Sequence, residues 1–293
     1  MNFIETLLNG LSSGGTYAMI ALGYTMVYGI AKMLNFAHGD VIMVGGYTLF
    51  VMSTTLGLNP LIALVVAIIC CAALGIAIEK VAYKPLRGAS PLAVLITAIG
   101  MSTLLQSVAQ VAFGSSTQPV NLFDLTKLDM TIGSLKISGY TMVTLISSAV
   151  IMISLTMFVK YTRLGRAMIA VSEDKGAAQL MGINVNFIIS ITFAIGSAMA
   201  AFAGFFMSLK TYNVDPYMGA MPGIKAFTAA VIGGIGSIPG AMVGGILMGV
   251  VEAFAQQSPA LAPYTDAIEF SILIVILLVR PSGILGKKRR EKV

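Results

Sequence analysis

Long apolar runs constrain the fold of this chain more than any other feature. Residues 61–77 are apolar on every face, whereas strands of a membrane β-barrel alternate apolar and polar residues. Charged residues make up 10% of the chain, against about a quarter in an ordinary soluble domain. Hydrophobic residues reach 57%, and the mean hydropathy is +0.91. We therefore expect an all-α, polytopic bundle of transmembrane helices.

The number of spans follows from the length of these runs. A helix needs about 20 apolar residues to cross a bilayer. Some of the runs are shorter, so we expect eight or nine spans. The candidate runs are residues 6–30, 40–57, 60–78, 91–113, 139–159, 186–209, 223–235, 239–256 and 267–280. The first run has neither the charged region nor the cleavage site of a secretory signal, so we expect it to be retained as a span.

The basic residues predict the orientation, because cytoplasmic loops of membrane proteins are rich in lysine and arginine. Nine spans, with the N-terminus outside and the C-terminus in the cytoplasm, place most of them inside. The lysines left for the outer side are Lys127, Lys136, Lys210 and Lys225. The basic tail, residues 281–293, is expected to lie on anionic lipid, and no nucleic-acid partner is expected for it.

One polar stretch, residues 161–184, lies between two apolar runs. Its charged residues include Arg166, Glu173 and Asp174. Its apolar residues could form one apolar helix face. They are Ala167, Ala170, Val171, Ala178, Leu180 and Met181. We expect a short cytoplasmic helix that contacts a partner. Gly182 is suited to end it, and Gly176 in its middle predicts a kink or a split. The alternative is a surface helix that is merely solvated.

The sequence lacks the residues that several classes of enzyme and metal-binding protein need. The sequence has no phosphate-binding loop, since the nearest approach at residues 283–287 has the wrong spacing. His38 is the only histidine, and the adjacent Cys70 and Cys71 lie in an apolar run, so no metal site is expected. Ionisable residues inside the spans are scarce. We therefore expect no enzymatic activity, and any uphill transport would draw its energy from elsewhere.

Four motifs follow one another along the chain. They are N-F-A-H-G-D at 35–40, G-R-A-M at 165–168 with A-A-Q-L-M-G-I-N at 177–184, G-G-I-G-S-I-P-G at 233–240 and R-P-S-G-I-L-G at 280–286. In this order they resemble the LivH-type permease of bacterial branched-chain amino acid ABC transporters. The resemblance implies a type II-like importer permease of the inner membrane. It also implies a second related permease as heterodimer partner, two cytoplasmic ATPase subunits that bind the ATP, and a periplasmic substrate-binding protein.

The resemblance also suggests a role for the polar stretch. It implies that residues 161–184 form the coupling helix that sits in a cleft of the ATPase. The residues carried over for this role are Arg166, Glu173, Asp174, Leu180, Met181 and Gly182. Closure of the nucleotide-bound ATPases would push on this helix and tilt the two spans that it connects.

Polar residues inside the spans are candidates for the translocation path. They are Ser12, Ser13, Thr16 and Tyr17 in the first span, and Thr97, Ser102, Thr103 and Gln106 in the fourth. Hydrogen bonds to neighbouring helices or to their own backbone are at least an equal alternative. Asn35, His38 and Asp40 are candidates for a gate. The alternatives are a helix cap or first-turn charge for Asp40 and a structural hydrogen bond for His38.

Glycines at four-residue spacing predict close helix packing in the bilayer. Gly236, Gly240 and Gly244 form one stripe, and Gly245 with Gly249 forms the adjacent one. Such helices can also slide during transport. Ser237 and Pro239 predict a tight turn at residues 233–240 between two shorter helices.

The apolar runs predict one transmembrane domain, residues 1–293, and the resemblance implies a permease that imports leucine, isoleucine and valine as part of an ATP-driven complex. A urea or short-amide permease on the same scaffold is the first alternative. An ion-coupled secondary carrier is the second.

Overall fold

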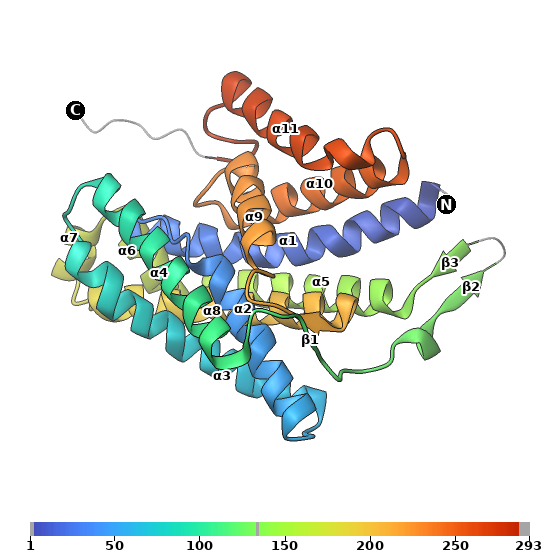
Figure 1. Cartoon of the computed structure of the whole chain (residues 1–293). Coiled ribbons are helices and arrows are strands. Elements are labelled where there is room, and N and C mark those ends of the chain that lie inside the picture. Colours follow the sequence, from blue (N-terminus) through green and yellow to red (C-terminus); the bar gives the residue numbers. More distant parts are fainter. Residues whose placement is uncertain (1–2, 133–134, 287–293) are drawn as a thin grey trace.

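The computed structural model describes residues 3–132 and 135–286, and the basic tail from residue 287 lies outside them. The described chain is mostly helical (Figure 1). Its α-helices are α1 (Phe3–Ala31), α2 (His38–Leu49), α3 (Pro60–Ile78), α4 (Pro91–Phe113), α5 (Gly139–Tyr161), α6 (Arg163–Glu173), α7 (Lys175–Leu180), α8 (Val185–Thr211), α9 (Ala220–Gly233), α10 (Ile238–Gln257) and α11 (Thr265–Val279).

Two short two-stranded pairs depart from the expected all-α class. Strand β1 (Gln118–Pro119) pairs with β4 (Asn213–Val214), and β2 (Met130–Ile132) pairs with β3 (Leu135–Ile137), both antiparallel. They lie in the segments that connect helices, where the backbone has no helical partners and must find others. The bundle itself is helical.

Six of the described helices are long and apolar enough to cross a membrane, by length and composition. They are Pro60–Leu86, Pro91–Phe113, Gly139–Tyr161, Val185–Thr211, Ile238–Gln257 and Ala262–Val279. The chain is therefore a multi-pass membrane protein. The expected spans at 6–30, 40–57 and 223–235 correspond to α1, to α2 with the π-helical segment Phe50–Thr55, and to the shorter apolar helix α9. The count of eight or nine stays a prediction.

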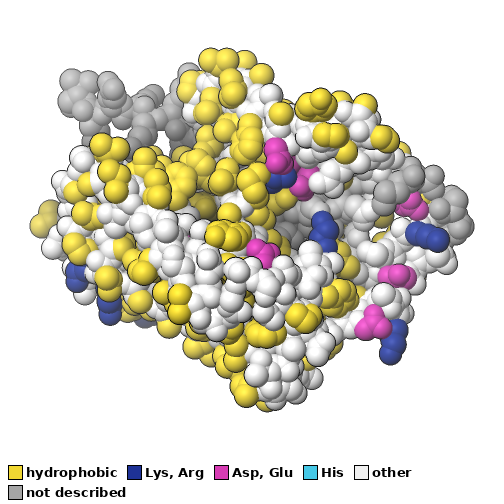
Figure 2. Space-filling model, in the orientation of Figure 1, with side chains coloured by type: hydrophobic (Ala, Val, Ile, Leu, Met, Phe, Trp, Pro, Cys, Tyr) yellow, Lys and Arg dark blue, Asp and Glu magenta, His cyan; other side chains and the backbone are white. Residues whose placement is uncertain are grey.

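Helix α1 forms the centre of the bundle. It packs most extensively on α10, and also on α8, α5 and α9. In Figure 1, α10 and α11 lie on one side of α1, and α5 lies on the other. Helix α8 is central as well, since most of it is buried, whereas most of α4 is not. Hydrophobic side chains are spread over the face seen in Figure 2, and many large apolar side chains are exposed, as expected for a surface in contact with lipid.

Glycines allow the closest helix contacts. A Cβ atom on Gly249 of α10 would lie 2.1 Å from the backbone nitrogen of Gly14 of α1. Gly245 contacts Ala18 of α1 in the same way, while Gly240 and Gly244 face the backbone of α9. Helix α9 ends at Gly233 and α10 begins at Ile238, which confirms the turn expected between two shorter helices. Gly236 lies in this turn with φ +95°.

Candidate functional site

The polar stretch forms two helices, with the break earlier than expected. Helix α6 ends at Glu173, and α7 begins at Lys175. The split lies at Asp174, whose backbone is extended and whose carboxylate accepts the backbone N–H groups of Gly176 at 2.9 Å and Ala177 at 3.0 Å. An N-cap aspartate thus determines the boundary, rather than the low helix propensity of Gly176. Gly182 follows α7 with φ +81°, where its expected role as a terminator needs it.

The buried apolar face of α6 and α7 was predicted only in part. Met168 and Val171 of α6 and Ala178 of α7 are buried. Leu180 and Met181 do not continue that buried face, because they are 90% and 82% exposed at the end of α7. An exposed apolar pair at a helix end can be covered by a partner subunit. Arg166, Glu173 and Asp174 are exposed as well.

Helix α7 is tied to the end of α1. Lys175 Nζ donates a hydrogen bond to the carbonyl oxygen of Ala31, the last residue of α1, at 3.1 Å. Burial and the neighbouring Arg87 charge hold the pKa of Lys175 below its usual range. The polar stretch therefore contacts α1 directly, in addition to the two helices, α5 and α8, between which it lies in the sequence.

The three gate candidates are all buried. Asn35 Oδ1 accepts a hydrogen bond from the Tyr83 hydroxyl at 2.9 Å. Asp40 lies in the first turn of α2, and its Oδ1 accepts a hydrogen bond from Gln106 Nε2 of α4 at 2.7 Å. Gln106 Nε2 also contacts Ser102 Oγ at 3.3 Å. The structure thus brings a gate candidate and two path candidates together.

His38 lies in the core. It is 1% exposed, and its ring packs edge-on against Tyr24 with the centroids 4.7 Å apart. The ring makes a hydrogen bond to the backbone of Ile20, while Nε2 has no partner among the described residues. This geometry matches the structural alternative for His38.

Two of the four path candidates of α1 line a polar cavity. They are Ser12 and Ser13, and the volume of the cavity is about 400 Å³. Its walls also include Asn9, Thr141, Lys210 and Glu252. Within the described part of the chain, the hydroxyl oxygens of Ser12 and Thr16 are buried without a partner. Tyr17 is partly buried beside them.

The remaining path candidates, in α4, lie elsewhere. Thr97 is half-buried. Thr103 is exposed, and its hydroxyl donates to the carbonyl of Ile99 in its own helix at 3.0 Å.

Sequence reasoning missed a cluster of four charged residues. Lys225 is not in an outer loop but in α9, and it is only 7% exposed. Its Nζ lies 2.8 Å from Glu252 Oε1 of α10, and 2.8 Å and 3.3 Å from Asp266 Oδ1 and Glu269 Oε2 of α11. Figure 2 shows acidic and basic side chains together between α9 and α11. The available signal was an isolated charge in each of three apolar runs, which in a membrane protein indicates pairing.

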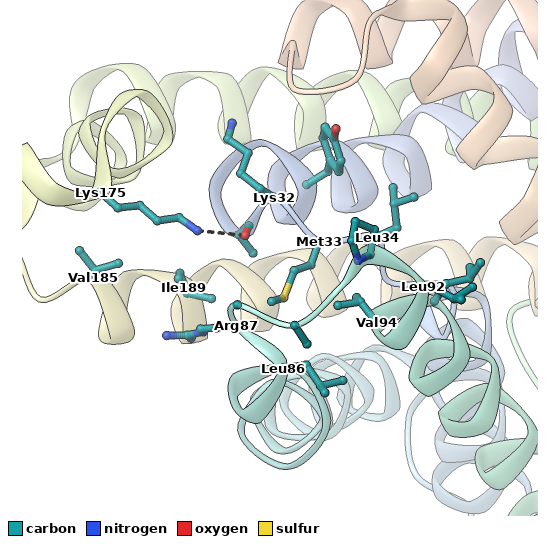
Figure 3. Close-up of a pocket in the computed structure, with 16 residues that line it drawn as sticks. Lys32, Met33, Leu34, Leu86, Arg87, Leu92, Val94, Lys175, Val185 and Ile189 are labelled. Atoms are coloured by element: carbon teal, nitrogen blue, oxygen red, sulfur yellow. Dashed lines mark hydrogen bonds between the residues drawn. The ribbon is translucent and has the colours of Figure 1, made fainter. Parts of the chain in front are cut away.

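A second cavity, the basic cavity, adjoins the end of α1 (Figure 3). Its volume is about 890 Å³, and it lies between residues 28–34, residues 86–95, Lys175 and the first turns of α8. Lys32, Arg87 and Lys175 reach it from three segments of the chain. Arg87 is bonded to Glu79 and Asn186, and Lys32 donates to the carbonyl of Gly29.

Comparison with known proteins identifies relatives over the whole chain. Residues 6–277 match the family model described as the branched-chain amino acid transport system permease component. BraD from Pseudomonas aeruginosa, a high-affinity branched-chain amino acid transport system permease protein, is 44% identical over 100% of this chain and 98% of its own length. LivH from Escherichia coli, which has the same description, is 44% identical over 99% of this chain and 98% of its own length.

A solved structure shares less. A chain of PsaBC from Streptococcus pneumoniae in complex with Fab is 20% identical, with a TM-score of 0.42, over 95% of this chain and 90% of that chain. A likeness at this score carries no argument about the fold or the site.

Proposed function

The chain belongs to the family of branched-chain amino acid transport permease components, and from this membership we propose that it imports leucine, isoleucine and valine across the bacterial inner membrane. The observation that carries the proposal is the 44% identity to BraD and LivH along the whole chain. The permease itself would have no ATPase site. ATP would be bound by two cytoplasmic ATPase subunits, and no further cofactor is needed.

The partners follow from the same membership. A second, related permease would complete a heterodimeric pore, and a periplasmic binding protein would deliver the substrate. Nine spans of a type II-like permease, with the C-terminus in the cytoplasm, would place residues 161–184 on the ATPase side. The exposed Leu180 and Met181 support this placement, because they offer apolar surface at the end of α7 where an ATPase could cover it.

The contacts of α7 suggest how ATPase closure would reach the pore. A push on α7 acts on α5 and α8 through the chain itself. It also acts on α1 through the bond from Lys175 to Ala31. Because α1 lies at the centre of the bundle and carries Ser12 and Thr16, this contact would transmit movement directly to candidate path residues.

The Asp40–Gln106 bond is a candidate gate contact. It joins α2, which packs against the core, to α4, which is mostly exposed. A tilt of α4 away from α2 would break it and free two polar groups for solvent or substrate. Asn35 and His38 would then hold the start of α2 in place, through their contacts with Tyr83 and Tyr24.

One observation favours a second candidate function. Ionisable residues in spans often relay ions in carriers, and Lys225 with its three carboxylates is such a group. An ion-coupled carrier would transport its solute without ATP. The family membership favours the importer subunit, with the cluster as a structural link between α9, α10 and α11.

Uptake in proteoliposomes tests the substrate. The complex would be isolated from bacterial membranes, reconstituted with its binding protein and ATP, and supplied with radiolabelled leucine or urea. Leucine uptake that competes with isoleucine and valine would support the proposal. Urea uptake without leucine uptake would transfer the same architecture to the urea or short-amide class and overturn the substrate assignment.

A further inference from the structure

The basic cavity combines positive charge with apolar walls. Lys32, Arg87 and Lys175 contribute the charge, and no acidic residue is among the described residues that line the cavity. Glu79, which lies behind the lining, is bonded to Arg87 and offsets part of that charge. The apolar wall includes Leu86, Leu92, Val94, Leu95, Val185 and Ile189. A volume of about 890 Å³ suits a drug-sized group such as a lipid headgroup.

The backbone around the cavity adds to its positive character. Helix α4 begins at Pro91 and α8 begins at Val185, and both residues line the cavity. The first turn of a helix presents N–H groups and the positive end of the helix dipole. Repulsion between Arg87 and Lys175 contributes to the lowered pKa of Lys175, so these two cations lie close enough to affect each other. An anion held beside Lys175 would relieve that repulsion.

Lys32 carries a conformational cost at this site. It follows the last residue of α1 with φ +61°, a left-handed conformation that glycine adopts at helix ends without strain. The backbone conformation therefore does not explain why this position holds a lysine, and its side chain must. Its side chain turns back to the carbonyl of Gly29 and lines the cavity beside Lys175 (Figure 3).

The cavity also has an open side next to an exposed helix. Leu92 in the first turn of α4 is 63% exposed, and most of α4 faces outward. An acyl chain could leave the cavity along this apolar surface while its headgroup stays near the lysines. The cytoplasmic leaflet supplies anionic phospholipid at this depth, given the cytoplasmic placement of residues 161–184.

We propose that the basic cavity binds one anionic phospholipid of the inner leaflet, with the phosphate between Lys32 and Lys175 and an acyl chain against Leu92 and Leu95. The bound lipid would join the end of α1 to the start of α7, at the contact through which the ATPases are proposed to act. This goes beyond the proposed transport function, and it rests on that proposal for the cytoplasmic placement of the polar stretch and for the action of the ATPases on it.

Native mass spectrometry of the purified transporter complex tests the proposal. The complex is stripped of lipid and offered equal amounts of dioleoyl phosphatidylglycerol and dioleoyl phosphatidylcholine. We expect a preference of about 25-fold for phosphatidylglycerol, because each of the two lysines near the headgroup adds about fivefold in affinity. Lys32→Gly suits the left-handed backbone and removes only the charged side chain, so it should weaken phosphatidylglycerol binding about fivefold. Lys175→Gln should do the same by an independent substitution.

Lys84→Gln is the matched control. Lys84 is an exposed cation in the same segment that does not line the cavity, so its variant should bind as the unmodified complex does. Equal binding of the two lipids, or an equal loss in Lys84→Gln, would overturn the proposal. Displacement of the lipid by glycerol 1-phosphate or inorganic phosphate at the same concentration would assign the cavity to a soluble anion instead, and would overturn it too.

Discussion

Replacement of Lys225 by methionine should strongly destabilise the permease. Lys225 is the cation shared by Glu252, Asp266 and Glu269. Asp266 can turn to its surroundings, since its side chain is 53% exposed, but the side chain of Glu269 is fully buried. Neither carboxylate oxygen of Glu269 has a hydrogen-bond partner in the described structure, so the ion pair is its main compensation.

The magnitude follows from the cost of leaving one buried charge without its partner. Removal of one member of a buried ion pair costs about 3–5 kcal/mol. With an unfolding entropy of about 2.1 cal/mol/K per residue, a chain of 293 residues would lose roughly 5–8 °C in Tm. The double variant Lys225→Met with Glu269→Gln should recover part of this loss, because the buried carboxylate is then gone. With Glu269→Gln measured alone as the second single variant, the loss in the double variant minus the sum of the two single losses gives the coupling energy of the pair.

Thermal unfolding of the purified protein in detergent, followed by loss of the monodisperse chromatographic peak, measures this effect. Lys127→Met is the control, because it removes an exposed lysine outside the helices of the cluster. If Lys225→Met melts within about 2 °C of Lys127→Met, the cluster makes no net contribution and the reasoning is refuted.

Three further predictions concern the polar stretch and the glycine stripe. Met181→Asp should reduce co-purification of the ATPases more than tenfold (about 1.4 kcal/mol or more), whereas Met130→Asp, on a distant hairpin, should not; equal retention in pull-downs would contradict the docking role. Asp174→Ala should lower stability by about 1 kcal/mol through loss of the α7 cap, read as faster proteolysis at this loop; unchanged cleavage would count against the cap. Gly249→Ala should prevent tight packing of α10 on α1 and lower stability by about 1–3 kcal/mol or more. Gly100 has open space around it, so Gly100→Ala should be neutral or stabilising in the same melting assay. Similar melting temperatures for the two variants would argue against close packing.

The helical bundle could be predicted because its cause is local. In a bilayer each backbone group must find its partner within the segment, so long apolar runs indicate helices. Pro239 and the surrounding glycines marked the turn before α10 for a similarly local reason, since they disfavour continuous helix. The family resemblance rested on four motifs, and three of them lie within residues 6–277, the part of the chain that the family model matches.

The details of the site depend on contacts that a linear pattern does not contain. The low helix propensity of glycine predicted a break near Gly176. The Asp174 side chain instead accepts hydrogen bonds from the N–H groups of Gly176 and Ala177, and this places the boundary between α6 and α7 at Asp174. Leu180 and Met181 fit the apolar face by type, yet α7 starts anew after Asp174, which changes the direction of that face. The Lys225 cluster joins three helices, so no single segment of sequence reveals its pairing.

The most direct test of the central claim compares the complete transporter with the isolated chain in proteoliposomes. If this chain is a permease subunit driven through residues 161–184, leucine uptake should require ATP, the ATPase subunits and the second permease together. The chain alone should take up no leucine. ATP-independent leucine flux through the isolated chain would contradict the account and favour an ion-coupled carrier.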